Sequence, residues 1–252
     1  MGVLDRLGFR RKVRWQERWA VYPGTVEDAL AIYFVDLGAA GAAPVAELPV
    51  RLDATVRFVA RDDGMPADGH LHSVQRLEEV VSAVARQHGG AFVGRVITAG
   101  TCRYTAYLPM EPAGPVILPR DDFEPVISIE RDATWTYVRG VLAPDERQRH
   151  VIGDLGVVQA LVQHGDPLDP ARPVDHTGLF ADRARAQAAA VELRFDGFTV
   201  TVEPDRNGGF VLEAVRVDPV APPELHELTW SVCEVVRRHG GVYDGWSCEV
   251  VR

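Results

Sequence analysis

Cysteine, long apolar runs and known catalytic motifs are scarce or missing in this chain of 252 residues. The three cysteines, Cys102, Cys233 and Cys248, are odd in number and lack C-x-x-C spacing, which argues against a secreted disulfide framework. No run of about 18 apolar residues occurs, so no transmembrane helix is predicted. The basic stretch Met1 to Arg14 is not followed by an apolar run, so it does not resemble a signal peptide. We therefore expect a cytoplasmic protein.

The motifs that mark common enzyme classes are also missing. The chain has no G-x-S-x-G, H-E-x-x-H or G-x-x-x-x-G-K-[ST], and no G-x-G-x-x-G at a strand–helix junction. His70 and His72 stand two residues apart, but zinc needs more ligands and no cluster at ligand spacing lies nearby. The sequence thus predicts no metal, no cofactor and no recognisable catalytic machinery.

What the chain has in excess is negative charge. Its formal net charge is −9, and the part from Pro144 onward, with 18 acidic and 11 basic residues, accounts for −7 of it. Nucleic-acid binding normally needs a basic face that displaces counterions from phosphates. We therefore expect no direct contact with nucleic acid and no binding to a membrane.

Length and patterning predict two α+β domains, residues 1–143 and 144–252, with the boundary near Ala143-Pro144. The second domain opens with a helix over Asp145 to His164. Its remaining pattern is strand, helix, strand, strand, helix, strand, over Pro173 to Phe180, Ala181 to Phe195, Gly197 to Val202, Phe210 to Val217, Pro222 to His239 and Tyr243 to Val251. This order predicts a ferredoxin-like βαββαβ fold, with a four-stranded antiparallel sheet and both helices on one face.

The first domain is predicted to be a second α+β unit with an antiparallel sheet. We expect a loop over Leu37 to Pro49, a helix over Ser73 to Gln87 and a Pro-rich connector over Pro109 to Pro125. A hairpin should turn at Ala99-Gly100. The expected strands cover Trp19 to Tyr22, Ala29 to Asp36, Thr55 to Ala60, Phe92 to Ile97 and Cys102 to Leu108, with a β-like pattern over Val126 to Val138.

The most unusual local sequence is Tyr243-Asp244-Gly245-Trp246, at the start of the last strand. On a regular strand the two aromatic residues would face opposite ways, but an Asp-Gly bulge would re-aim one of them. One interpretation is core packing beside a turn. The other is a partly exposed aromatic anchor of the kind that dominates protein interfaces.

Asp175 and His176 place an acid beside a histidine. A catalytic pair would also need a nucleophile and an orienting group. Adjacent residues on a strand point to opposite faces, so we expect these two not to pair with each other. A structural or surface role is therefore favoured over a catalytic one.

Several segments together resemble a known family. They are Gly165-Asp166-Pro167-Leu168, Ala171-Arg172-Pro173-Val174-Asp175-His176, Asp196-Gly197-Phe198-Thr199-Val200 and His239-Gly240-Gly241-Val242-Tyr243-Asp244-Gly245-Trp246. This series, over Asp145 to Arg252, resembles RraB, the regulator of ribonuclease E activity B. It departs from that family at Thr177, at Ser247-Cys248 and in its large N-terminal domain. That domain is similar to an uncharacterised bacterial domain often found before an RraB segment, through the Gly64-Met65-Pro66 turn, the Arg103 to Leu108 strand and Trp135-Thr136-Tyr137.

The resemblance implies a ferredoxin-like fold and a non-enzymatic role in which a protein partner, a ribonuclease or a degradosome component, is bound and inhibited. The candidate contact residues are Tyr243, Asp244 and Trp246, with Arg172, Asp175 and His176 as weaker ones. Two alternatives stay open at this stage. The protein could be an enzyme or small-molecule binder that uses Asp175 and His176 in an interdomain cleft, or an immunity-type protein that neutralises a toxin. The sequence leaves the oligomeric state open.

Overall fold

The computed structural model describes residues 15–118, 123–206 and 208–251, in two compact units, Met1–Asp145 and Glu146–Arg252. Residues 1–14, 119–122, 207 and 252 lie outside this range. They include the Met1 to Arg14 stretch, part of the Pro-rich connector and the last residue of the Asp145 to Arg252 series.

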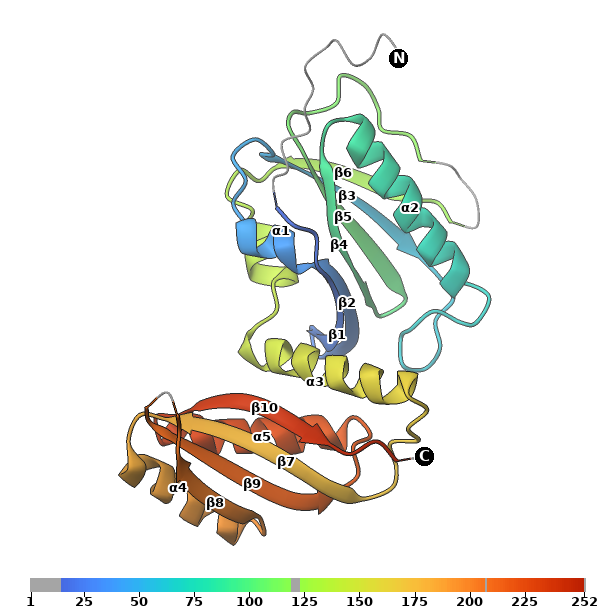
Figure 1. Cartoon of the computed structure of the whole chain (residues 1–252). Coiled ribbons are helices and arrows are strands. Elements are labelled where there is room, and N and C mark those ends of the chain that lie inside the picture. The colour runs from blue at the N-terminus through green and yellow to red at the C-terminus, as the bar shows by residue number, and fades with distance from the viewer. Residues whose placement is uncertain (1–14, 119–122, 207, 252) are drawn as a thin grey trace, which may run out of the picture. The chain divides into compact units, whose positions relative to one another are not determined.

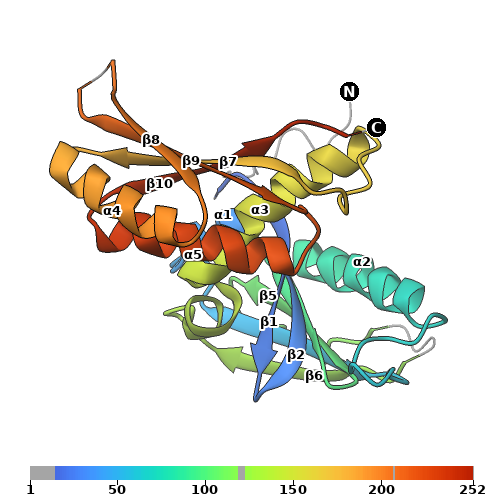
Figure 2. The ribbon, with the colours of Figure 1, turned by 90° about the horizontal axis from the view of Figure 1, so that it is seen from below.

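The C-terminal unit has the predicted ferredoxin-like arrangement (Figure 1). Its sheet has the strand order β10-β7-β9-β8, and every neighbouring pair is antiparallel. Figure 2 shows α4 and α5 on the same face of these strands. The elements are α3 Glu146–Gln163, β7 Arg172–Phe180, α4 Arg183–Phe195, β8 Thr199–Pro204, β9 Phe210–Asp218, α5 Glu224–Arg238 and β10 Val242–Cys248.

The core of this unit follows from strand alternation and one glycine. Along β7, buried and exposed residues alternate almost without interruption, as expected of a strand with one covered face. Gly178 belongs to the buried set, and a Cβ atom there would lie only 3.0 Å from the Val236 side chain of α5. The absence of a side chain therefore allows α5 to approach the sheet closely. Phe180, Leu193 and Leu212 fill the space between the two layers.

The N-terminal unit is a six-stranded antiparallel sheet with the strand order β1-β2-β4-β5-β3-β6, and α2 packs on β4 and β5 (Figure 1). Buried Leu52 and Ala54 of β3 and Tyr104 of β5 belong to the core that faces α2. The strands are β1 Trp19–Val26, β2 Ala29–Asp36, β3 Val50–Arg57, β4 Ala91–Thr98, β5 Thr101–Leu108 and β6 Val126–Arg131; the helices are α1 Leu37–Ala42, α2 Leu71–Gln87 and the π-helical turn η2 Val138–Leu142.

The expected loop from Leu37 onward is wrong in its first half, where the chain forms α1. Asp36 begins this helix because its side chain accepts a hydrogen bond from the Gly38 amide at 2.8 Å. The same carboxylate also accepts from the Arg18 amide and the Trp15 indole. The Ala and Gly composition suggested a loop, whereas the N-cap hydrogen bond of Asp36 stabilises a helix.

The third strand lies earlier than the sequence suggests. It covers Val50–Arg57 and not Thr55 to Ala60, because its residues pair with both β5 and β6. The Val126 to Val138 pattern likewise holds only as far as Arg131. There the Asp132 side chain accepts hydrogen bonds from the Thr136 and Tyr137 amides and turns the chain. The Ala99-Gly100 hairpin is confirmed: both residues have positive φ, at 44° and 73°.

Candidate functional site

A β-bulge in β10 orients the two aromatic residues that the sequence singled out. The pairing of β10 with β7 shifts between Tyr243 and Gly245, and Gly245 has a φ of 116°. As a result Tyr243 lies opposite Gly178, and Trp246 lies opposite His176. Both β7 partners belong to the buried set, so both aromatic residues face the helices. The predicted bulge is confirmed.

Trp246 is buried, with 8% of its surface exposed. Its indole Nε1 donates to Asp154 Oδ1 of α3 at 2.9 Å. Thr229 Oγ1 donates to the other oxygen of Asp154 at 2.6 Å, and His226 Nδ1 lies 3.0 Å from that oxygen. The partly exposed anchor considered from the sequence is thus a core residue here, and a role in partner binding stays a prediction.

His176 and Tyr243 form a second polar pair beneath the sheet. Their Nδ1 and hydroxyl oxygen lie 2.9 Å apart, and His176 is fully buried. Burial raises the pKa of the Tyr243 hydroxyl and lowers the pKa of His176 to about 4. His176 is therefore neutral at pH 7, and its Nδ1 shares a hydrogen bond with the tyrosine hydroxyl group. The pair holds β7 and β10 together from the helix side.

Arg172 is also buried, because its guanidinium group binds Asp166 and the segment that follows β10. Its guanidinium pairs with the buried carboxylate of Asp166 and donates to the Glu249 carbonyl oxygen at 3.2 Å. The Val251 amide donates to the same Asp166 side chain at 2.8 Å. Hydrogen bonds from Arg172, ahead of other causes, hold the pKa of Asp166 well below its usual range. This arrangement fixes the end of the chain to the loop that follows α3.

Asp175 and Asp244 are the two candidates that the structure leaves exposed. Asp175 alternates with buried His176, so the two lie on opposite faces of β7, as predicted. Neither carboxylate forms an ion pair with a residue of the described part of the chain. Of the six sequence candidates, Tyr243, Trp246 and His176 are brought together on the helix-covered face of the sheet. Arg172 lies apart from them, with Asp166 and the residues after β10. Asp175 and Asp244 are the exposed ones.

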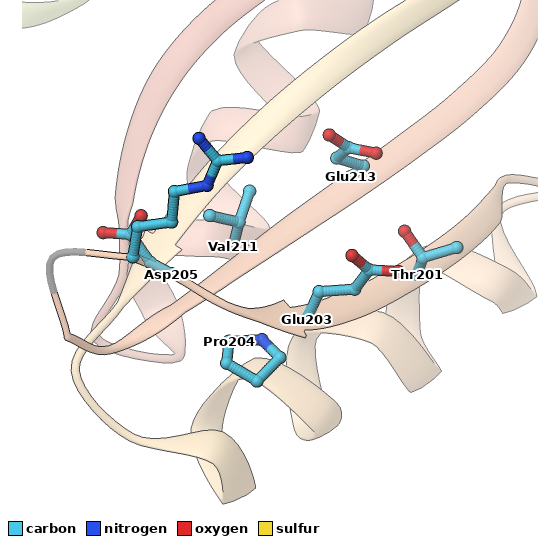
Figure 3. A pocket seen from close by; sticks show the side chains of 7 residues that line it. Thr201, Glu203, Pro204, Asp205, Val211 and Glu213 are labelled. Atoms are coloured by element: carbon cyan, nitrogen blue, oxygen red, sulfur yellow. The ribbon is translucent and has the colours of Figure 1, made fainter.

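Two acidic residues on the same sheet were missed by the motif search. Glu203 of β8 and Glu213 of β9 are exposed, and they line a hollow of about 220 Å³ together with Thr201, Val211 and the turn residues that follow β8. Figure 3 shows Glu203, Glu213 and Thr201 on the side of the strands away from the helix. The available signal was strand alternation, since each carboxylate occupies an outward position between inward-facing residues.

The N-terminal unit contains a polar network of its own. Buried Asp53 accepts from Thr105 Oγ1 at 2.8 Å and from Arg51 Nε at 3.0 Å, and burial raises its pKa. The Tyr107 hydroxyl donates to Asp132 at 2.7 Å, and the Tyr107 ring stacks on Trp135. Asp53 and Asp132 each accept hydrogen bonds from neighbouring side chains. These bonds stabilise the face of the sheet opposite α2.

The remaining chemistry-bearing side chains form no further site among the residues described. No group of three or more His, Cys, Asp or Glu side chains in these residues is placed to hold a metal ion. Burial raises the pKa of the Cys102 thiol to about 12 and that of Cys233 to about 11, so neither thiol is reactive near neutral pH. Within the same residues, every helix is too short or too polar to cross a membrane.

Comparison with known protein families assigns both halves of the chain. Residues 154–248 match the family described as regulator of ribonuclease activity B, RraB. Residues 17–114 match DUF695, a family of unknown function. A search of curated proteins found no match. The chain therefore carries an N-terminal DUF695 domain and a C-terminal RraB domain.

Proposed function

We propose that this protein is a non-enzymatic regulator that binds a ribonuclease E-type endoribonuclease, or a degradosome component attached to it, and lowers its activity in RNA turnover. The match of residues 154–248 to a family described as regulating ribonuclease activity carries this proposal. The DUF695 domain has no established role and enters the proposal only as part of the intact chain.

The chemistry of the C-terminal domain supports binding over catalysis. His176, Asp154 and Arg172 of this domain carry groups of the kind that act as acid, base or anion binder in enzymes. All three are buried and engaged by side chains of the same domain. A general acid or base must reach its substrate directly or through one water molecule. Buried groups of this kind stabilise the fold instead.

Exposed carboxylates are the groups on which we base the partner contact. We propose Asp175 and Asp244 as contact residues, and Tyr243, Trp246, His176 and Arg172 as residues that hold their strands in place. The C-terminal part carries a net charge of −7, which favours a basic partner surface and speeds association with it.

The direct test is an RNA cleavage assay with the purified ribonuclease and increasing amounts of the full chain. We expect the cleavage rate of a short fluorogenic RNA to fall and then level off as the complex saturates. The double variant Asp175→Asn/Asp244→Asn should reach the same inhibition only at several-fold higher concentration.

Two results would count against the proposal. One is a cleavage rate that stays constant at every concentration of the chain. The other is turnover of the RNA by the chain in the absence of the ribonuclease, which would favour the enzyme alternative.

A further inference from the structure

The face of the C-terminal sheet opposite α4 and α5, called the open face below, combines three carboxylates with exposed apolar side chains. The carboxylates are Asp175, Glu203 and Glu213, one from each of three neighbouring strands. Leu179, Val217 and Val242 are exposed by 36%, 63% and 65%. Apolar residues at outward positions are unusual for a sheet face that serves only to contact water.

The three carboxylates form a straight diagonal across the sheet. Asp175 pairs with Val215, and Glu213 is two residues away from Val215 along β9. Glu213 pairs with Thr201, and Glu203 is two residues further along β8. Diagonal neighbours of this kind lie about 7–8 Å apart. The open face therefore presents negative charges in a row at regular spacing.

These charges are uncompensated within the described part of the chain. None of the three carboxylates makes an ion pair there, and the outward positions of the four strands hold no arginine or lysine. Arg206, which follows β8, is the basic residue among those that line the hollow with Glu203 and Glu213. Three like charges in a row repel one another and are neutralised best by a row of cations.

We infer that the open face docks a basic amphipathic helix of the ribonuclease partner; this inference rests on the proposed function. Helices normally cover sheet faces that carry apolar residues. Basic residues four apart on a helix are separated by about 6 Å, close to the spacing of the diagonal. Apolar residues that flank the basic ones on that helix would contact Leu179 and Val242 on one side of the diagonal and Val217 on the other. The hollow lined by Glu203 and Glu213 accepts the end of one arginine side chain.

The charge pattern also selects against other occupants. A phosphate backbone would be repelled by the three carboxylates, so RNA is not expected on this face. A partner strand added to the sheet would pair with one of the edge strands, β8 or β10, and would leave the diagonal largely uncovered. Loss of binding on removal of the diagonal charges therefore distinguishes a helix on the face from a strand at the edge.

The test uses the full chain and a synthetic 18-residue helical peptide with arginine at every fourth position and leucine on the same side. The triple variant Asp175→Asn/Glu203→Gln/Glu213→Gln removes the diagonal charges and keeps the side-chain shapes. The control variant Asp169→Asn/Asp196→Asn/Glu234→Gln removes three exposed carboxylates outside the open face. Fluorescence anisotropy gives the dissociation constants, and thermal unfolding verifies that all variants fold.

We expect the triple variant to bind the peptide about tenfold more weakly at physiological salt, and the control variant to differ from the wild type by less than about twofold. Absence of peptide binding by the wild type, or equal binding by the wild type and the triple variant, would overturn the inference. Equal losses in both variants would also overturn it, because they would reflect net charge alone.

The same proteins are then tested against the ribonuclease, which separates the two proposals. If the wild type binds the ribonuclease and the triple variant binds it equally well, the regulator function stands and the open face is refuted as its docking site. Peptide binding on the open face without any binding to the ribonuclease would refute the regulator function and keep the docking surface, with a different basic partner.

Discussion

Asp154 is the residue on which the polar part of the C-terminal core depends. It lies in α3 with 3% of its surface exposed, and it connects that helix to both α5 and β10. The two carboxylate oxygens of Asp154 form hydrogen bonds with Trp246, Thr229 and His226. No pattern in the sequence marks Asp154, because these three hydrogen-bond partners are separated from it by at least 72 positions, whereas His150, whose Nε2 lies 3.7 Å from the same carboxylate, is four positions away.

Replacement of Asp154 by alanine should lower the free energy of unfolding by about 3 kcal/mol, because buried donors lose their acceptor. Urea unfolding followed by tryptophan fluorescence measures the change. Asp175→Ala is the matched control, and exposed Asp175 should cost less than about 0.5 kcal/mol. Similar effects of the two substitutions would contradict the role given to Asp154.

His176 makes stability depend on pH. Burial is the main cause of its low pKa in the folded state, about 4 against 6.5 for an unperturbed histidine. Above pH 6.5 the ring is neutral in both states and contributes no pH dependence. Between pH 6.5 and 4 the unfolded state takes up a proton that the folded state does not, so stability falls with falling pH by up to about 3 kcal/mol.

The variant His176→Gln should therefore lose less stability than the wild type between pH 6.5 and 4, as measured by urea unfolding at each pH. A residual slope is expected, because burial also lowers the pKa of His150. NMR titration of the wild type gives an independent reading. An imidazole resonance of His176 that titrates near pH 6.5 would contradict its burial.

The bulge in β10 decides which side chains reach the core. Without the shift at Asp244-Gly245, Trp246 would leave the helix side and Asp154 would lose its indole donor. The Tyr-Asp-Gly-Trp sequence predicted this bulge, because Asp-Gly at such a position favours irregular pairing. The sequence could not distinguish a buried from an exposed Trp246, since that depends on α3 and Asp154, far away in the chain.

Gly245→Ala tests the bulge directly. A Cβ atom at Gly245 would meet no atom within 4 Å, so the cost arises from the positive φ alone and should be about 1–2 kcal/mol. Gly156→Ala is a control for which the expected change in stability has the opposite sign. Gly156 lies inside α3 with open space around it, and alanine there should stabilise by about 0.5–1 kcal/mol. Thermal unfolding of both variants measures the difference, and a neutral Gly245→Ala would argue against the bulge.

Elements with strong local signals were predictable, and elements fixed by distant partners were not. The periodic apolar residues of α2 and α5 and the Gly-Gly ends after them gave both helices. The helix α1 was not predicted, because its start depends on the N-cap hydrogen bond of Asp36. The open face could be predicted only in part: alternation places Glu203 and Glu213 outward, but the diagonal with Asp175 depends on the strand order and register.

Charge distribution is the property of the whole chain that bears most directly on its function. The formal net charge is −9, of which the part from Pro144 contributes −7, and this part includes the RraB domain. Exposed charges act over distances of about a Debye length, roughly 8 Å at physiological salt. Association with a basic partner should thus be fast at low salt and slow at high salt.

The most direct measurement is the dissociation constant of the full chain for the purified ribonuclease across a series of sodium chloride concentrations, by biolayer interferometry. We predict binding that weakens steadily as salt rises, mainly through slower association. No binding at low salt would contradict the regulator function, and binding that is independent of salt would contradict the acidic docking surface.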